Sequence, residues 1–356
     1  MGDFYNTDMP SIFKNEFALG FEFLPKELLF RDNEMQEITS VIKPLLQDRP
    51  GVNLFIYGKP GLGKTAVVRF LLKKLEEADL ELEPFVLYVN CWKNNTSYKL
   101  ALEIAHALSF YSVQNKSGSE VLQAVVELLN KKPVVIVLDE VDKLEDFEAL
   151  YYLLEDVFKK SVIAIANDKS WVVRLEPRLR SRLQPQELEF KPYNKQQVHG
   201  ILKQRLDLAF IPNAWDLAAF ERVVDKTFAS GDIRVGLFLM RQAGLIAEYR
   251  NASKVLLQDV EKAISKLASF SVNPEEILDD DEKLILSIVT AQPQRIGDLY
   301  KVYKEKNGGL SYKSFQRKIL KLSKGKYLHL ERVHKGGTTT LVSKGLKQGL
   351  QRFIDG

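Results

Sequence analysis

The sequence predicts an α/β fold with a parallel sheet, followed by a helical segment and then by a winged-helix segment. Three observations lead to this prediction. Apolar runs of strand length alternate with amphipathic runs over the first 190 residues, which is typical of a parallel sheet buried on both faces. Helical periodicity alone follows from Asn194 to Leu267. Near the end, two short apolar runs flank Gly336-Gly337, which predicts a hairpin.

The first part of the chain supplies the elements of the sheet. Residues 1–24 mix polar and aromatic side chains and predict an irregular arm, and residues 34–46 carry apolar side chains at helical spacing. The expected strands are 53–57, 85–90, 133–138 and 162–166, and the expected helices between them are 65–72, 97–110, 118–130 and 145–159. Together they predict a base domain over residues 1–190.

The remainder of the chain predicts two further domains. Helices are expected at 195–208, 215–228, 232–248 and 257–267, followed by a break at 271–276. Helices 282–291, 296–306 and 311–322 then precede strands 327–333 and 338–342, which is the order of a winged helix. We therefore expect a helical lid domain over residues 191–273 and a winged-helix domain over residues 274–356.

The charge of the chain is unevenly distributed. The net charge is +4. Residues 280–356 hold 16 Lys and Arg against seven Asp and Glu, an excess of nine, which leaves −5 for the rest. This asymmetry suggests a polyanionic partner, although a solvated basic surface is the alternative. The single cysteine, Cys91, indicates a reducing cytoplasmic location. No apolar run is long enough to span a bilayer, so no membrane partner is expected.

The stretch Gly58 to Thr65, GKPGLGKT, matches the phosphate-binding loop G-x-x-x-x-G-K-[ST] at every fixed position. A predicted strand precedes it and a predicted helix follows it, as the motif requires. The glycines let backbone N–H groups turn inward, and the amino end of the helix favours a phosphate there. Lys64 can then reach the β and γ phosphates, and the Thr65 hydroxyl can ligate Mg²⁺. A glycine-rich turn with a chance lysine is the alternative.

Polar side chains also follow two later strands. Asp139 and Glu140 come directly after the run 134–138. In that position, Asp139 would hold Mg²⁺ and Glu140 would orient or deprotonate the attacking water. Asn167 follows the next strand and would position that water. Solvated acids at a strand end and a turn-forming Asn-Asp pair are the alternatives.

Arginines and one tyrosine supply further candidates for contacts with the nucleotide. The run 174–183 contains several arginines, of which Arg182 is the first choice and Arg178 the second for reaching a phosphate on a neighbouring subunit. Local pairing with Glu176 and Glu187, or a DNA-facing surface, would also explain that run. Arg234 opens a lid helix and could reach the γ phosphate. Tyr193 and Arg205 could touch the base and the phosphates, or be an exposed aromatic and an ordinary helix-face arginine.

The predicted helix 311–322 has an apolar stripe and an opposite polar face. That polar face suits the major groove, because it carries charged and hydrogen-bonding groups. It consists of Lys313, Ser314, Gln316, Arg317 and Lys321. The expected wing adds Arg332, Lys335, Gly336 and Thr338. A winged helix that docks on protein is the alternative.

Seven stretches resemble the archaeal origin-recognition initiators of the AAA+ ATPase family. They are LPKELLFRDNEMQEI, NLFIYGKPGLGKTAV, YVNCWKNNTSYKLALEI, VVIVLDEVDKL, RLEPRLRSRL, KPYNKQQVHGILKQR and SGDIRVGLFLMRQA. The resemblance implies a P-loop base with a helical lid and a DNA-binding winged helix. It implies that Gly63, Lys64, Thr65, Ala66 and Val67 bind the ATP phosphates, to which the loop motif adds Gly61. It also implies that Tyr193, Arg205 and Arg234 contact the nucleotide, and that Phe30 and Arg31 lie near the adenine.

These patterns together predict an ATP-dependent initiator of DNA replication that uses ATP and Mg²⁺. It would bind double-stranded origin DNA, hydrolyse ATP slowly as a switch and help to recruit or load the replicative helicase. A second initiator subunit, or further copies of the chain, would be its other partners. An ATP-gated DNA-binding regulator, or an ATPase from a mobile element, is the alternative function. A clamp-loader-like subunit is a third alternative, which the winged helix disfavours.

Overall fold

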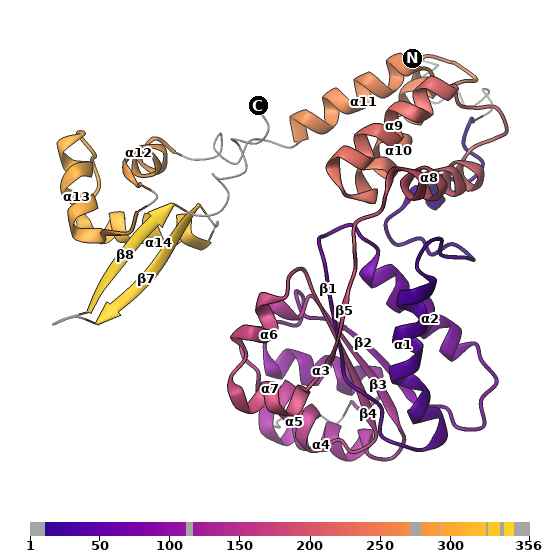
Figure 1. The fold of residues 1–356 in the computed structure, drawn as a ribbon, viewed down its shortest axis with the longest axis horizontal. Coiled ribbons are helices and arrows are strands. Elements are labelled where there is room, and N and C mark those ends of the chain that lie inside the picture. Colours follow the sequence, from indigo (N-terminus) through magenta and orange to yellow (C-terminus); the bar gives the residue numbers. More distant parts are fainter. Residues whose placement is uncertain are drawn as a thin grey trace. The chain divides into compact units, whose positions relative to one another are not determined.

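The computed structural model describes residues 11–111, 117–270, 279–290, 292–324, 327–334 and 338–344. The chain forms two compact units, residues 1–265 and 266–356. The predicted base and residues 191–265 of the predicted lid belong to the first unit, and the last residues of that lid, from 266, belong to the second (Figure 1).

A parallel sheet forms the centre of the first unit. In the described part of the chain its strands are β1 (Leu54–Tyr57), β2 (Phe85–Asn90), β3 (Val134–Asp139), β4 (Lys160–Ala166) and β5 (Gln186–Glu189). Their order in the sheet is β2-β3-β4-β1-β5, and every neighbouring pair is parallel. The carboxyl ends of β1, β3 and β4 therefore meet at one edge, which is where open parallel sheets place their ligands.

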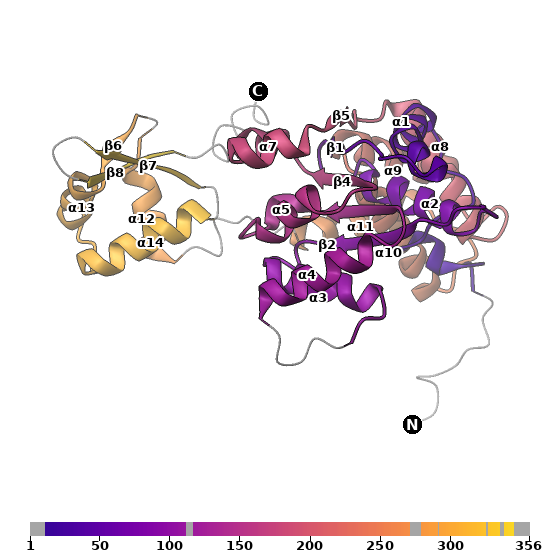
Figure 2. The ribbon, with the colours of Figure 1, turned by 90° about the horizontal axis from the view of Figure 1, so that it is seen from below.

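Helices cover both faces of this sheet (Figures 1 and 2). On one face, α1 (Asp32–Ile42) and α2 (Lys64–Glu76) pack against alternate residues of the strands, such as Leu54 and Ile56. The other face packs against α3 (Ser97–Ala107), α4 (Gly118–Leu129), α5 (Glu148–Glu155), α6 (Ser170–Arg174) and α7 (Pro177–Leu183). Because each central strand is buried on both sides, its sequence is almost continuously apolar.

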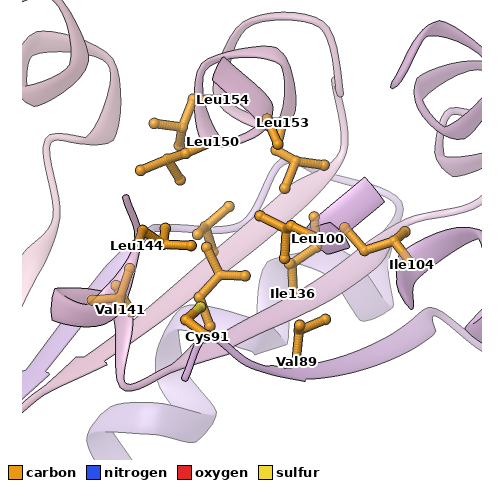
Figure 3. Packing of buried hydrophobic residues seen from close by; sticks show 14 of the residues in the cluster. Val89, Cys91, Leu100, Ile104, Ile136, Val141, Leu144, Leu150, Leu153 and Leu154 are labelled. Atoms are coloured by element: carbon orange, nitrogen blue, oxygen red, sulfur yellow. The ribbon is translucent and has the colours of Figure 1, made fainter. Parts of the chain in front are cut away.

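The larger core lies under α3 and α5 (Figure 3). Leu100 and Ile104 of α3, Leu150 of α5 and Ile136 of β3 belong to this core, and all four are at most 1% exposed. The apolar residues at helical spacing on α3 and α5 are therefore the ones that face the sheet. This packing stabilises both helices far more than their intrinsic helix propensity does.

The lid consists of α8 (Lys195–Ala209), α9 (Leu217–Ser230), α10 (Ile233–Tyr249) and α11 (Leu257–Phe270). Asn194 begins α8 with a capping box, and Asp216 and Asp232 accept hydrogen bonds from the first turns of α9 and α10. These caps place three helix starts at defined residues. The start of α10 is the one that reaches the phosphate-binding loop.

The second unit has the element order expected for a winged helix. Its helices are α12 (Asp280–Ile288), α13 (Ile296–Glu305) and α14 (Tyr312–Lys324). Its antiparallel sheet has the order β6 (Gln294–Arg295), β8 (Thr338–Lys344) and β7 (Leu328–His334). The predicted helices and both predicted strands are confirmed here, with shifts of a few residues at their ends.

Several parts of the base differ from the sequence prediction, among them β5, α5 and the unpredicted helix α6. Strand β5 was not predicted, because QELE carries a single apolar residue, Leu188; as an edge strand beside β1 it buries only that side chain. Helix α5 is shorter than the predicted 145–159, since a 3₁₀ turn at Val141–Lys143 and the run 144–147 precede it. Among the described residues, no helix has the length and apolar character needed to cross a membrane.

Candidate nucleotide-binding site

The phosphate-binding loop lies between β1 and α2. Gly61 and Gly63 have φ angles of +76° and +85°, a conformation that side chains with a Cβ rarely adopt. The Lys64 ammonium lies beneath the loop and donates to the carbonyls of Gly58 (2.6 Å) and Lys59 (3.0 Å) and to Asn167 Oδ1 (3.4 Å). Burial lowers the pKa of Lys64, and the nearby Asp139 carboxylate opposes that effect. The predicted residues Lys64 and Asn167 are thus in contact across neighbouring strands.

Asp139 is the centre of a second group of contacts at this edge. Its Oδ2 accepts hydrogen bonds from the Thr65 hydroxyl (2.8 Å) and the Tyr88 hydroxyl (2.6 Å), and its Oδ1 accepts from the N–H of Glu140 (2.9 Å). A buried carboxylate next to a threonine hydroxyl is an all-oxygen donor set beside a phosphate-binding loop, which fits Mg²⁺. Among the described residues, no His, Cys, Asp or Glu cluster forms a further metal site.

Tyr88 is a part of this site that the sequence analysis missed. It lies on β2, which neighbours β3, and burial together with Asp139 raises its pKa strongly. The phenol therefore stays protonated and donates to Asp139 over the whole physiological pH range. The available signal was a polar hydroxyl in the strand that pairs with the acid-bearing strand.

Glu140 stands next to Asp139 in a left-handed backbone conformation, with φ +55°. Burial and the neighbouring carboxylates Asp139 and Asp142 raise its pKa. A carboxylate whose proton affinity is raised is a better general base. Its position and its pKa shift therefore agree with the predicted role in activating water.

Arg31 joins the loop to the start of the lid. It is 5% exposed. Its guanidinium donates to the carbonyls of Leu62 and Lys191 (3.0 Å each) and to the Tyr193 hydroxyl (2.8 Å), and it also pairs with Glu34. It lies over the Tyr193 ring, 3.9 Å from the centroid. The predicted residues Arg31 and Tyr193 are therefore in direct contact.

Arg205 of α8 is also largely buried. It donates to the carbonyls of Ala18 and Phe23 (3.1 Å each), and burial lowers its pKa to about 10. It therefore fixes the segment before α1 against the lid as a protonated guanidinium. The predicted residue Phe30 does not line the cleft that Arg31 and Arg205 border; a Cβ on Gly200 would lie 2.9 Å from its ring, so Phe30 packs against α8.

A cleft of about 460 Å³ joins these groups. The segment before α1 lines one side, the phosphate-binding loop another, and α8 and α10 of the lid a third. Its lining includes Arg31, Gly61, Gly63, Lys64, Thr65, Ala66, Val67, Asp139, Glu140, Asn167, Tyr193, Arg205 and Arg234. The volume is within the range of small-molecule sites.

The arginines of α7 lie outside this cleft lining. Arg182 pairs with Glu155 through Nε at 2.7 Å, and Arg178 stacks over the Tyr151 ring, 4.4 Å from its centroid. The alternative of local pairing is therefore observed for Arg182, but its partner is Glu155 and not Glu176 or Glu187. Both arginines are exposed, so action on a neighbouring subunit stays a prediction.

In the second unit, α14 presents the predicted DNA-facing residues. Lys313 and Arg317 are exposed, and Ser314 and Gln316 are half-buried. The Lys321 ammonium pairs with the buried carboxylate of Glu282 at 2.6 Å, so part of its charge is already neutralised. Arg332 and Thr338 lie on the backbones of β7 and β8. Lys335 and Gly336 lie outside the described residues.

The fold and the site define the class: a P-loop ATPase of the AAA+ type with a helical lid. Residues 49–183 match the family model for an AAA domain, and residues 199–265 match that for a Cdc6 AAA+ ATPase-type lid domain.

The chain is 31% identical over 332 residues to ORC1-type DNA replication protein 2 of Haloarcula marismortui, covering 86% of this chain and 79% of that protein. It is 32% identical over 331 residues to the ORC1-type DNA replication protein of Pyrococcus furiosus, covering 83% and 76%. The solved structure of the Aeropyrum pernix ORC1 protein in complex with DNA is similar, with a TM-score of 0.72, 29% identity and coverage of 95% and 94%. The chain belongs to the family of ORC1-type DNA replication proteins, which confirms the resemblance.

Proposed function

We propose that this protein is an ATP-dependent initiator of DNA replication that binds origin DNA through its carboxyl-terminal unit. The observation that carries this proposal is the cleft between base and lid, in a chain of the ORC1-type family whose second unit is strongly basic. The similar Aeropyrum pernix ORC1 protein was solved with DNA, which supports a DNA partner for this chain as well.

The residues of the cleft divide the chemistry of ATP hydrolysis among them. Lys64 and the N–H groups of the loop neutralise and position the phosphates. Glu140, with its raised pKa, takes the proton of the attacking water, and Asn167 orients that water. Thr65 and Asp139 would hold Mg²⁺, which neutralises charge on the phosphates when bound. Arg31 and Tyr193 fix the loop against the lid.

The contact with DNA is proposed for α14 and the hairpin of the second unit. Lys313, Gln316 and Arg317 lie on the side of α14 that the core residues Phe315 and Ile319 leave free. A helix with this arrangement can place side chains against base edges in the major groove, while basic residues of a wing contact phosphates. Recruitment of the replicative helicase, a second initiator subunit and a cytoplasmic location belong to the same proposal.

Footprinting on the origin region of the host chromosome, with and without ATP, tests this function. We expect protection of discrete sites in origin DNA and none on a fragment of equal length and composition from elsewhere. The variant Lys64→Ala is the matched control, because it removes the buried ammonium under the loop and leaves the second unit unchanged. Equal protection of both fragments would contradict origin recognition and favour an ATP-gated regulator that acts at other sites.

A further inference from the structure

The start of α10 lies against the phosphate-binding loop. The N–H of Ile233 points at the carbonyl of Gly61, 3.4 Å away. Asp232 caps the helix, because its Oδ1 accepts a hydrogen bond of 2.9 Å from the N–H of Arg234. The cap residue of this lid helix is therefore also a neighbour of the loop that holds phosphates.

The same carboxylate holds the Arg234 side chain. Nε of Arg234 lies 3.0 Å and 3.1 Å from the two carboxylate oxygens of Asp232, and Nη2 lies 2.6 Å from Oδ2. These are charge-assisted, forked hydrogen bonds, which are the strongest kind that an arginine makes. Arg234 is the predicted contact of the γ phosphate, but its guanidinium is paired here with the carboxylate of Asp232, two residues before it.

The Asp232 carboxylate lies close enough to the phosphate-binding loop to affect a polyphosphate bound there. A Cβ built on Gly61 would lie 1.9 Å from Asp232 Oδ1 and 2.2 Å from its Cγ. The carboxylate is thus packed directly on the backbone of the phosphate-binding loop, and its side chain is 23% exposed. An anion in this place repels a polyphosphate chain on the loop, except where Arg234 neutralises it.

We propose that Asp232 is a specificity-determining residue that competes with the γ phosphate of ATP for the Arg234 guanidinium. When ATP binds, its γ phosphate has to replace Asp232 as the partner of the Arg234 guanidinium. ADP lacks the γ phosphate and leaves the Asp232–Arg234 pair intact. Asp232 therefore weakens the binding of the triphosphate relative to the diphosphate. This inference rests on the proposed nucleotide-binding function and deepens it, because it names what sets the preference between the two nucleotides.

The variant Asp232→Asn tests the competition. Asparagine keeps the shape and is an equally good helix cap, so it removes the charge alone. Affinity for a non-hydrolysable ATP analogue, measured by calorimetry, is expected to rise by about fivefold to tenfold, because charged hydrogen bonds to Arg234 become available to the phosphate. Affinity for ADP is expected to rise by no more than about twofold. A purely structural role of Asp232 predicts weaker binding of both nucleotides.

Asp216→Asn is the matched control. Asp216 caps α9 in the same way, accepting from the N–H of Ala218 at 3.0 Å, and its ion-pair partner is Lys254, which does not line the cleft. We expect it to leave both affinities unchanged. In an Arg234→Ala background, Asp232→Asn should no longer raise affinity for the ATP analogue more than for ADP. Should Asp232→Asn fold poorly, Asp232→Ser also caps a helix without charge and carries the same expectation.

The outcomes separate this inference from the function on which it rests. Wild-type protein that binds neither nucleotide overturns both. Wild-type protein that binds ATP, with an unchanged ratio of the two affinities in Asp232→Asn, overturns the competition alone. A selective gain for the ATP analogue that disappears in the Arg234→Ala background supports it.

Discussion

The hydroxyl of Tyr88 offers the most direct perturbation of the proposed Mg²⁺ site. Tyr88→Phe removes one oxygen atom and leaves the ring on β2. The change deletes the 2.6 Å hydrogen bond to Asp139 Oδ2, and that oxygen keeps the hydrogen bond from the Thr65 hydroxyl at 2.8 Å. Because Asp139 is 3% exposed, water has little access to replace the lost donor.

The expected magnitude follows from the charge of the acceptor. A hydrogen bond to a charged group contributes about 1.5–3 kcal/mol, and outer partners of metal ligands typically change metal affinity by about 10–100-fold. The Asp139 carboxylate would rotate more freely and lose its fixed orientation toward Thr65. We expect the Mg²⁺ concentration at half-maximal nucleotide binding to rise by about tenfold or more.

Binding of a fluorescent ATP analogue, titrated with Mg²⁺, measures this directly and does not depend on turnover. With the metal chelated, Tyr88→Phe and wild type should bind the analogue with similar affinity. Tyr249→Phe is the control, because the Tyr249 side chain on the lid is 94% exposed and its hydroxyl contacts solvent. An unchanged Mg²⁺ midpoint in Tyr88→Phe would refute the reasoning that this phenol orients Asp139.

Three further predictions concern charged groups. Lys64→Ala should lower ATP affinity at least about tenfold in a binding titration, since it removes the ammonium beneath the loop; affinity within twofold of wild type would contradict that placement. Asp259→Asn should destabilise the first unit by about 1.5–3 kcal/mol in urea unfolding, because it removes the charge of a buried carboxylate that accepts hydrogen bonds from Arg250. Burial raises the Asp259 pKa, but hydrogen bonds from Arg250 and the Leu256 N–H lower it by more. The pair therefore stabilises the protein above about pH 4, and its contribution is lost as the pH falls further. A difference in stability between the wild type and Asp259→Asn that persists at pH 2 would argue against this reasoning. Arg317→Ala should weaken DNA binding by about 1–3 kcal/mol, whereas Lys321→Ala should chiefly lower thermal stability, because it removes an ion-pair partner of Glu282; the reverse ranking in gel-shift and melting experiments would overturn this division.

The sheet and the phosphate-binding loop could be predicted because their signals are local. Strands β1, β3 and β4 are buried almost throughout, so each reads as an apolar run, and the loop motif is contiguous in sequence. Strand β5 carries one buried side chain, Leu188. The sequence pattern of such a short polar run cannot be told apart from that of a turn. It becomes a strand only because β1 offers it a free edge for pairing.

The partners of the predicted polar residues could not be derived in this way. Periodicity assigns a residue to a face of a helix or strand, and it carries no information on which distant group that face meets. Arg31 and Tyr193 are 162 positions apart, and Arg205 and Ala18 are 187 apart. Tyr88 likewise gains its role from the register between β2 and β3, since a shift of one residue would turn its hydroxyl to the opposite face.

The three arginines between base and lid divide their roles according to burial. Arg31 and Arg205 are 5% and 9% exposed, and they donate to backbone carbonyls of the loop, of Lys191 and of the segment before α1. Breaking those contacts would leave a buried cation unpaired, which costs several kcal/mol, so both arginines hold the lid in place. The Arg234 side chain is 50% exposed and is paired with a single carboxylate. Exchange of that partner for a phosphate keeps the charge compensated, so Arg234 is the arginine through which a nucleotide can act on the lid.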